Sequence, residues 1–124
     1  MNIVVRMIMV LFDVTIAMCF IASTSIAADS MGNDPNVKVL FENDEVRVFE
    51  AIRPPGTKLP MHEHPPFVVI FMSSYKAKQI LPNGKEVVKD YTAGKASHRP
   101  KGLKHGIEIL GTVDQHVIMV EMKK

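Results

Sequence analysis

The sequence predicts an all-β fold, a sandwich or barrel built from short antiparallel strands. From Val37 onward, short segments rich in Val, Ile and Phe alternate with turns that contain Gly or Pro. The strongest hairpin signal is Asn83-Gly84, which lies between two such segments. No segment after residue 36 carries apolar residues at helical spacing. A chain of 124 residues has room for one domain of this kind.

The first 27 residues have the layout of a secretory signal peptide. Arg6 precedes an apolar run over residues 7–22, and small residues follow up to Ala27, after which cleavage is expected. An uncleaved membrane anchor is the alternative. Against it, Asp13 interrupts the run, which is also shorter than the roughly 20 residues that span a bilayer. We therefore expect a periplasmic or secreted protein without stable membrane insertion after cleavage.

The composition excludes several classes of function for the mature chain. Cys19, the only cysteine, would leave with the leader, so disulfides, thiolate ligands and cysteine nucleophiles are excluded. The formal net charge of +2 is unchanged, because Arg6 and Asp13 leave together. A charge so near zero, without Trp and without aromatic residues interleaved with basic ones, gives no case for nucleic-acid binding.

The elements follow in order from a polar linker. Residues 28–36 are rich in turn formers and predict a short, flexible lead-in. Pro54-Pro55-Gly56 forces a corner, and residues 67–72 are apolar throughout, so both faces of that strand should be covered. A second subunit could cover one face, and we expect a homodimer. The expected strands are residues 37–41, 45–53, 67–72, 75–81, 86–91, 105–110 and 116–122.

Two histidine-containing stretches carry the chemistry. Residues 56–64 read G-x5-H-x-H, which ends in His62 and His64. Alternate side chains of an extended strand share one face, so these two imidazoles should point the same way. Residues 94–105 read G-x5-P-x-G-x2-H and end in His105. A third imidazole from a strand that folds back alongside completes three corners of a metal site.

Together, at this separation, the two stretches resemble the paired motifs of the cupin superfamily, over roughly residues 37–122. The resemblance implies an antiparallel jelly-roll β-barrel over 37–122, with a metal held by His62, His64 and His105. Two departures stand out. Val68 and Val69 occupy the positions where the family's first motif carries a Glu, and Ile109 replaces the Asn of the second. The carboxylate ligand of the family is therefore absent.

The surroundings of the two first-motif histidines also favour a metal. If the strand runs unbroken through Pro65-Pro66, the alternate residues Pro66, Val68 and Ile70 share a face with His62 and His64. This face is apolar and should therefore point inwards. Buried imidazoles need partners, which a metal supplies. Three imidazoles are compatible with Fe(II), Zn(II), Mn, Ni or Cu. Because they are neutral, the charge of a divalent ion should attract an anionic or chelating small molecule.

The remaining polar residues of the second stretch have two interpretations each. His98 is either a fourth ligand or proton shuttle, or an exposed loop residue, which the sequence favours. Lys95, Arg99, Lys101 and Lys104, with Arg53 near in space, would steer an acidic substrate towards the barrel mouth. The alternative, an ordinary solvated loop, is the more common use of such charges.

The sequence leaves two functions open. The first is an exported cupin that carries out a metal-dependent, dioxygenase-type oxidation of a small chelating anion. The second is a non-enzymatic module that binds a small ligand or a metal. The chain shows no acid/base pair and no nucleophile motif, and the loss of the motif Glu and Asn tilts the balance slightly towards binding.

Overall fold

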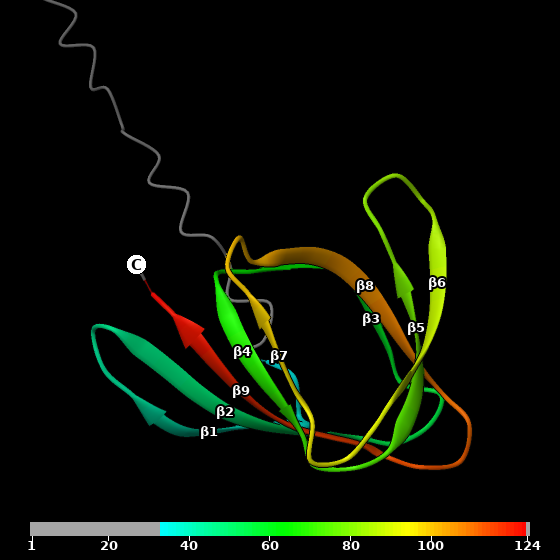
Figure 1. The fold of residues 1–124 in the computed structure, drawn as a ribbon, viewed down its shortest axis with the longest axis horizontal. Coiled ribbons are helices and arrows are strands. Elements are labelled where there is room, and N and C mark those ends of the chain that lie inside the picture. Colours follow the sequence, from blue (N-terminus) through cyan, green and yellow to red (C-terminus); the bar gives the residue numbers. More distant parts are fainter. Residues whose placement is uncertain (1–32, 124) are drawn as a thin grey trace, which may run out of the picture.

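The computed structural model describes residues 33–123, and the predicted signal peptide and residues 28–32 of the linker lie outside them. The described chain is all-β and antiparallel (Figure 1). Its strands are β1 (Val37–Glu42), β2 (Val46–Arg53), β3 (Lys58–His64), β4 (Phe67–Phe71), β5 (Tyr75–Ile80), β6 (Glu86–Tyr91), β7 (Ala96–Arg99), β8 (Leu103–Leu110) and β9 (Gln115–Met122).

The strands form two sheets that enclose the core. One sheet has the order β1-β2-β9-β4-β7 and the other the order β3-β8-β5-β6. The last strand, β9, lies between β2 and β4, so the end of the chain is built into the centre of the larger sheet (Figure 1). The predicted all-β jelly roll is confirmed. The described strands form two facing sheets, and β6 and β7 are edge strands of different sheets.

The seven predicted strand ranges agree with observed strands to within one or two residues, and β3 was expected as an extended strand at His62 and His64 without stated bounds. Strand β7 was not expected, because four residues that include Ser97, His98 and Arg99 carry no apolar pattern. It nevertheless pairs with β4 along its whole length. The expected turn at Asn83-Gly84 is present, and Gly84 takes a positive φ of 82° that suits a glycine.

The core lies between the sheets. Phe49, Ile109 and Val117 are the largest side chains that are fully buried. Burial of a side chain of this size contributes about 1.5 to 3 kcal/mol relative to leaving it exposed. Because alternate residues of a strand point to opposite faces, the inward side chains of β2 and β9 that supply Phe49 and Val117 continue to Arg53 and Glu121. The same alternation thus brings polar groups into the interior.

The condition under which Val68 and Ile70 would face inwards, an unbroken strand through Pro65-Pro66, is not met. Pro65-Pro66 ends β3 at His64, and β4 begins at Phe67 with the opposite parity. Phe67, Val69 and Phe71 therefore face the core, whereas Val68 and Ile70 face outwards. The two prolines cannot donate backbone hydrogen bonds to a sheet, which accounts for the break.

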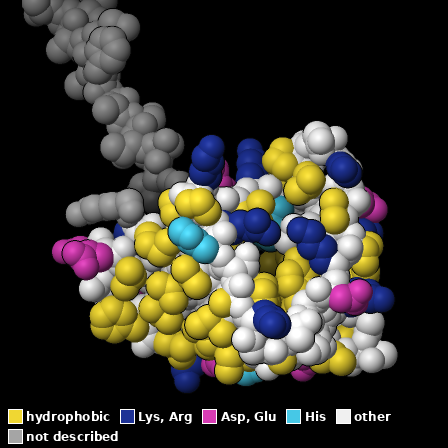
Figure 2. Space-filling model, in the orientation of Figure 1, with side chains coloured by type: hydrophobic (Ala, Val, Ile, Leu, Met, Phe, Trp, Pro, Cys, Tyr) yellow, Lys and Arg dark blue, Asp and Glu magenta, His cyan; other side chains and the backbone are white. Residues whose placement is uncertain are grey.

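The outer faces of the two sheets differ in character. On the smaller sheet, Lys78 pairs with both Glu86 and Glu108. On the larger sheet, Val48, Val120 and Val68 are cross-strand neighbours on the outside. The monomer therefore covers only one face of residues 67–72, since Ile70 is 38% and Met72 50% exposed. Figure 2 shows hydrophobic side chains gathered over the side of the molecule that β1, β2, β9 and β4 form.

The described part of the predicted linker is anchored to the sandwich. Two nitrogens of Arg53 donate to Asp34 Oδ2 at 3.0 and 2.9 Å, and both side chains are almost fully buried. The backbone N–H of Ile52 donates to the carbonyl of Asn36 at 3.0 Å. Residues 34–36 therefore belong to the domain rather than to a flexible lead-in. Within residues 33–123 there is no helix long and apolar enough to cross a membrane.

Candidate metal centre

Strands β3 and β8 bring the three predicted imidazoles together. His62 and His105 are direct cross-strand partners, and His64 lies two residues further on the same face of β3. All three side chains are buried, and each offers a ring nitrogen within 4.8 Å of the other two. The structure thus places together, inside the sandwich, three residues that the two sequence motifs had singled out.

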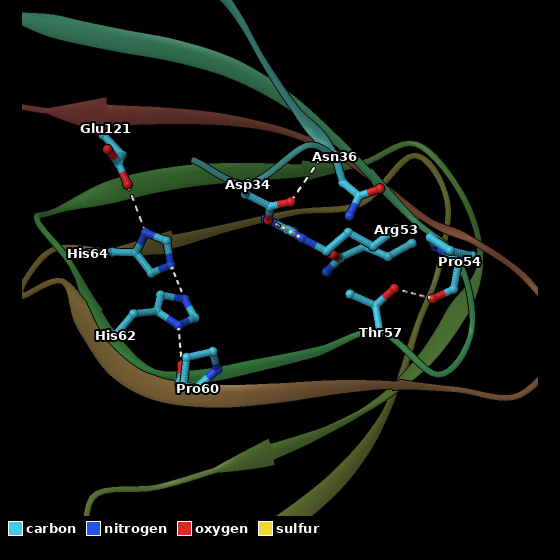
Figure 3. A network of polar contacts seen from close by, with 10 residues as sticks. Asp34, Asn36, Arg53, Pro54, Thr57, Pro60, His62, His64 and Glu121 are labelled. Carbon is cyan, nitrogen blue, oxygen red and sulfur yellow. Dashed lines mark hydrogen bonds and ion pairs between the residues drawn. The ribbon is translucent and has the colours of Figure 1, made fainter. Parts of the chain in front are cut away.

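Hydrogen bonds fix the ring orientations of the two β3 histidines. His62 Nδ1 lies 2.8 Å from the carbonyl oxygen of Pro60, and His64 Nδ1 lies 2.7 Å from Glu121 Oε1. Carbonyl and carboxylate oxygens only accept, so both Nδ1 atoms carry the hydrogen. Each Nε2 atom then presents a lone pair. These two Nε2 atoms lie 3.0 Å apart, as the row of contacts in Figure 3 shows.

Two Nε2 atoms at this distance share either a proton, in an N–H···N hydrogen bond, or a metal cation that both rings bind. A metal ion with metal–nitrogen distances of about 2.0 to 2.1 Å holds adjacent imidazole nitrogens about 3 Å apart. The separation of the His62 and His64 nitrogens therefore fits two corners of one coordination sphere. The ring nitrogen of His105 lies within 4.8 Å of those of His62 and His64, so a modest movement of its side chain would bring it to the same metal ion.

His105 is the third member, and its environment keeps it neutral. Burial, with additional contributions from His62 and His64, lowers the pKa of His105 to about 3. Its Nδ1 atom is buried without a hydrogen-bond partner among the described residues. Burial also lowers the pKa of His62. Neutral imidazole is the form that binds metals, so these rings are in the ligating state at neutral pH.

Glu121 is a site residue that sequence analysis missed. It lies on the inward face of β9 with Val117 and Met119, and it is only 7% exposed. The signal that could have revealed it is the alternation in β9, which places the carboxylate of Glu121 on the same face as the apolar Val117 and Met119. Metal-ligating histidines commonly donate their second ring N–H to such a carboxylate, which fixes the tautomer and raises the basicity of the ligand. The structure therefore supplies a negative charge behind His64.

Gly102 lets the second motif approach the first. Its φ is +71°, and a β-carbon at this position would collide with the carbonyl oxygen of His64. Only glycine has both the conformational freedom and the space. The motif positions that differ from the cupin pattern are apolar: Val69 faces the interior beside the imidazoles, and Ile109 is buried in the core.

A cavity of about 250 Å³ lies beside the imidazoles. Phe71, Tyr75 and Tyr91 form an aromatic wall, in which the two tyrosine rings stack with their centroids 4.7 Å apart. The charged side chains among the described lining residues are all cationic: Arg53, Lys89 and Arg99. Figure 2 shows the hollow, with hydrophobic side chains inside it and Lys and Arg side chains at its rim.

Arg53 belongs to a buried polar network at the other side of the cavity. Besides its contacts to Asp34, it donates through Nη1 to Gln115 Oε1 at 2.7 Å. Gln115 in turn donates through Nε2 to the hydroxyl of Tyr75 at 3.1 Å. Figure 3 shows Arg53 and Asp34 beside the imidazole row. The charge of this arginine is thus compensated within the protein.

The other candidate residues from the second motif do not cluster in the structure, and most of them lie away from the cavity. His98 is exposed and pairs with the outward-facing Val68, so the structure does not bring it to the imidazoles. Lys95, Lys101 and Lys104 are exposed and lie outside the cavity lining. Arg99 alone of this group lines the cavity. A fourth ligand or proton shuttle at His98 is therefore not supported by this geometry.

Fold and site together define a small jelly-roll protein whose interior holds an imidazole cluster suited to a divalent metal. Neither the scan against protein-family models nor the search of curated proteins finds a match. Solved structures do match. One is a cupin domain from Bordetella pertussis Tohama I, 28% identical, with a TM-score of 0.63, covering 71% of this chain and 92% of that one.

Two further structures share the fold at lower identity. An RmlC-like cupin with a double-stranded β-helix fold from Methanocaldococcus jannaschii is 18% identical, with a TM-score of 0.56, covering 69% of this chain and 77% of that one. A polyketide cyclase from Streptomyces resistomycificus is 16% identical, with a TM-score of 0.58, covering 76% and 72% respectively. The fold of the chain is thus that of cupin structures, and the matches support the membership of the cupin superfamily that its two motifs predict.

Proposed function

We propose that this protein is an exported small cupin that holds a divalent metal through His62, His64 and His105. The observation that carries the proposal is the pair of buried Nε2 atoms of His62 and His64, 3.0 Å apart, with a ring nitrogen of His105 within 4.8 Å of the cluster. Its export to the periplasm or beyond rests on the signal-peptide pattern of residues 1–27, which lie outside the described chain.

The protein's own groups prepare the site before any metal arrives. Pro60 and Glu121 hold the β3 imidazoles with Nε2 directed inwards. Burial keeps His105 neutral. When bound, the metal would supply Lewis acidity and a template for a small ligand. Imidazole donors are compatible with Fe(II), Zn(II), Mn, Ni or Cu, and the identity of the ion is left to experiment.

As an enzyme, the protein would carry out a dioxygenase-type oxidation of a small chelating anion. An anion is favoured because the described cavity lining contains cations and imidazoles but no carboxylate. The alternative is a non-enzymatic module that binds a small ligand or the metal itself. The absence of an acidic side chain in the described lining favours this alternative, since no carboxylate is in place as a general base.

The metal site is tested by elemental analysis of the protein as isolated, beside variants. Wild-type protein and the His98→Ala control should carry one equivalent of metal, whereas His62→Ala/His64→Ala should carry none. Equal metal in all three proteins would exclude the site. Oxygen-electrode assays of the Fe(II)-loaded protein with small diketones, phenols and organic acids then separate the two functions. Oxygen uptake that disappears in the double variant identifies an enzyme.

We also propose a homodimer that covers the apolar outer face of the larger sheet. Val68, Ile70 and Val120 form a contiguous apolar surface there, whereas the smaller sheet is charged outside. A second copy offers the same surface and so is self-complementary. Sedimentation of the mature protein should show a dimer that Ile70→Lys converts to a monomer. A monomer at high concentration would contradict this proposal.

A further inference from the structure

The hollow of Figure 2 lies in the region between β6 and β7 of Figure 1, and both strands contribute residues to the cavity lining. Strand β6 ends the smaller sheet and β7 ends the larger one, so each is hydrogen-bonded to a neighbouring strand on one side only. Each of these edge strands contributes a cationic side chain to the cavity lining, Lys89 from β6 and Arg99 from β7. Two positive charges therefore flank the opening from opposite sides.

These two cations differ from the third one in the lining. Arg53 is buried and ion-paired with Asp34 at 2.9 Å. Neither Lys89 nor Arg99 forms an ion pair with a carboxylate of the described residues. Lys89 is half-buried and Arg99 exposed, so both can reach a ligand in the cavity without loss of an existing partner. Their charge is available to an incoming anion.

Arg99 extends from its own sheet towards the other one. It is close enough to Tyr91 on β6 to lower the pKa of that hydroxyl, although burial dominates and the pKa of Tyr91 is raised overall. Arg99 also acts electrostatically on His105, on β8. Arg99 therefore lines the same cavity as the aromatic wall and the imidazole cluster, and its charge acts on a member of each.

The volume of the cavity and the residues that line it restrict further the kind of ligand that it can bind. A cavity of about 150 Å³ accepts benzene, so the 250 Å³ found in this protein suit a single substituted ring. Phe71, Tyr75 and Tyr91 offer flat apolar surface for such a ring. A flexible polar chain would leave this wall without a partner.

We propose that the ligand is a small aromatic or comparably flat unsaturated organic acid, with its carboxylate held between Lys89 and Arg99. This inference rests on the proposed function, because the body of the ligand then reaches from the opening along the aromatic wall towards the metal site. Arg99 supplies the planar fork that suits a carboxylate, and Lys89 adds a point charge from the opposite strand.

A pair of matched probes tests the proposal, 4-hydroxybenzoate and its uncharged analogue 4-hydroxybenzamide. Isothermal titration of the full mature protein should show at least about tenfold tighter binding of the acid, because only the carboxylate offers a charge to Lys89 and Arg99. Lys89→Gln and Arg99→Gln should each reduce this preference, and the double variant should abolish it. Lys101→Gln, in the neighbouring turn outside the cavity lining, is the control and should retain it.

The outcomes separate this inference from the metal site. Titrations are run on zinc-loaded and metal-free protein, with the metal content measured independently, and the acid preference is expected in both states. Loss of the metal site alone would leave the preference of the metal-free protein intact. Equal binding of acid and amide, failure of the acid to bind, or a preference that survives in the double variant would overturn the inference. Circular dichroism confirms that the variants are folded.

Discussion

His64 and Glu121 connect the two sheets through the candidate metal site. His64 lies at the end of β3 in the smaller sheet, and Glu121 lies on β9 in the larger one. Their contact of 2.7 Å joins side chains that are 2% and 9% exposed. The imidazole is therefore oriented by a strand from the opposite layer. Any shift of one sheet against the other would disturb the ring that offers the lone pair.

Substitution of Glu121 should weaken metal binding although Glu121 is not itself one of the three proposed metal ligands. In Glu121→Gln the amide retains the shape of the side chain but loses its charge, so the basicity of His64 should fall. We expect a 10- to 100-fold loss of metal affinity, measured by competition with a chelating dye.

The chain offers a matched control for that experiment. Glu50 and His116 form a contact of the same length, 2.7 Å, but on the outer face and about 30% exposed. Glu50→Gln should leave metal affinity unchanged. Equal affinity of Glu121→Gln and wild-type protein would show that Glu121 plays no part in the site.

A β-carbon at Gly102 should destabilise the protein more than one at Gly84. Both glycines have positive φ, but only Gly102 would bring its β-carbon against backbone, at the carbonyl of His64. Gly84→Ala should cost about 1 kcal/mol from conformational strain alone, and Gly102→Ala about 3 kcal/mol or more. Urea unfolding measures both values. Similar losses in the two variants would contradict the close approach of the motifs.

The stability of the metal-free protein should fall as the pH drops below about 6.5. An unfolded histidine titrates near pH 6.5, whereas the pKa of the folded His105 is about 3. Between these values the unfolded state binds one more proton, so His105 favours unfolding by up to about 1.4 kcal/mol per pH unit. The full stability is present above pH 6.5 and is lost progressively towards pH 3.

Urea unfolding at several pH values, after removal of metal, checks this prediction. His105→Gln should show a shallower loss of stability between pH 6.5 and 4 than the wild type. His98→Gln, a substitution at an exposed position, is the matched control and should follow the wild-type curve. A His105→Gln curve parallel to the wild type would refute the assignment.

Loss of charge at Asp34 should destabilise the domain although the residue lies outside the strands. Asp34→Asn keeps the acceptor for the N–H of Asn36 but leaves the buried guanidinium of Arg53 without a counter-charge. We expect a loss of about 2 kcal/mol or more. Glu42→Gln, whose partner Lys123 is 35% exposed, should cost less than about 1 kcal/mol. Calorimetric unfolding distinguishes the two, and equal losses would contradict a stabilising role of the Asp34–Arg53 pair.

The sequence was sufficient for the fold and for the three imidazoles. Strand 45–53 was marked by its Val, Ile and Phe residues, and strands 75–81 and 86–91 by the Asn83-Gly84 turn between them, which are local signals. The convergence of His62, His64 and His105 was expected from the alternation of side chains in a strand and from the resemblance to the paired cupin motifs, and the structure adds the register that pairs His62 with His105. These features depend on few residues close in sequence.

The features that sequence analysis missed depend on contacts between distant segments. Glu121 lies 57 residues from His64, and no local pattern states which carboxylate will reach a given imidazole. The orientation of Val68 was mistaken because two prolines changed the parity. Strand β7 exists because β4 offers it a free edge, rather than because of its own composition.

The unpaired edges of β6 and β7 have a consequence for the evolution of this protein. Because no ladder of backbone bonds joins the two strands, the width of the entrance is set by side chains alone. Substitution of one or two of these entrance side chains would admit ligands of another shape or charge. The two sheets and the imidazole cluster would remain unchanged. The ligand specificity of this protein can thus change through single substitutions that have little effect on folding.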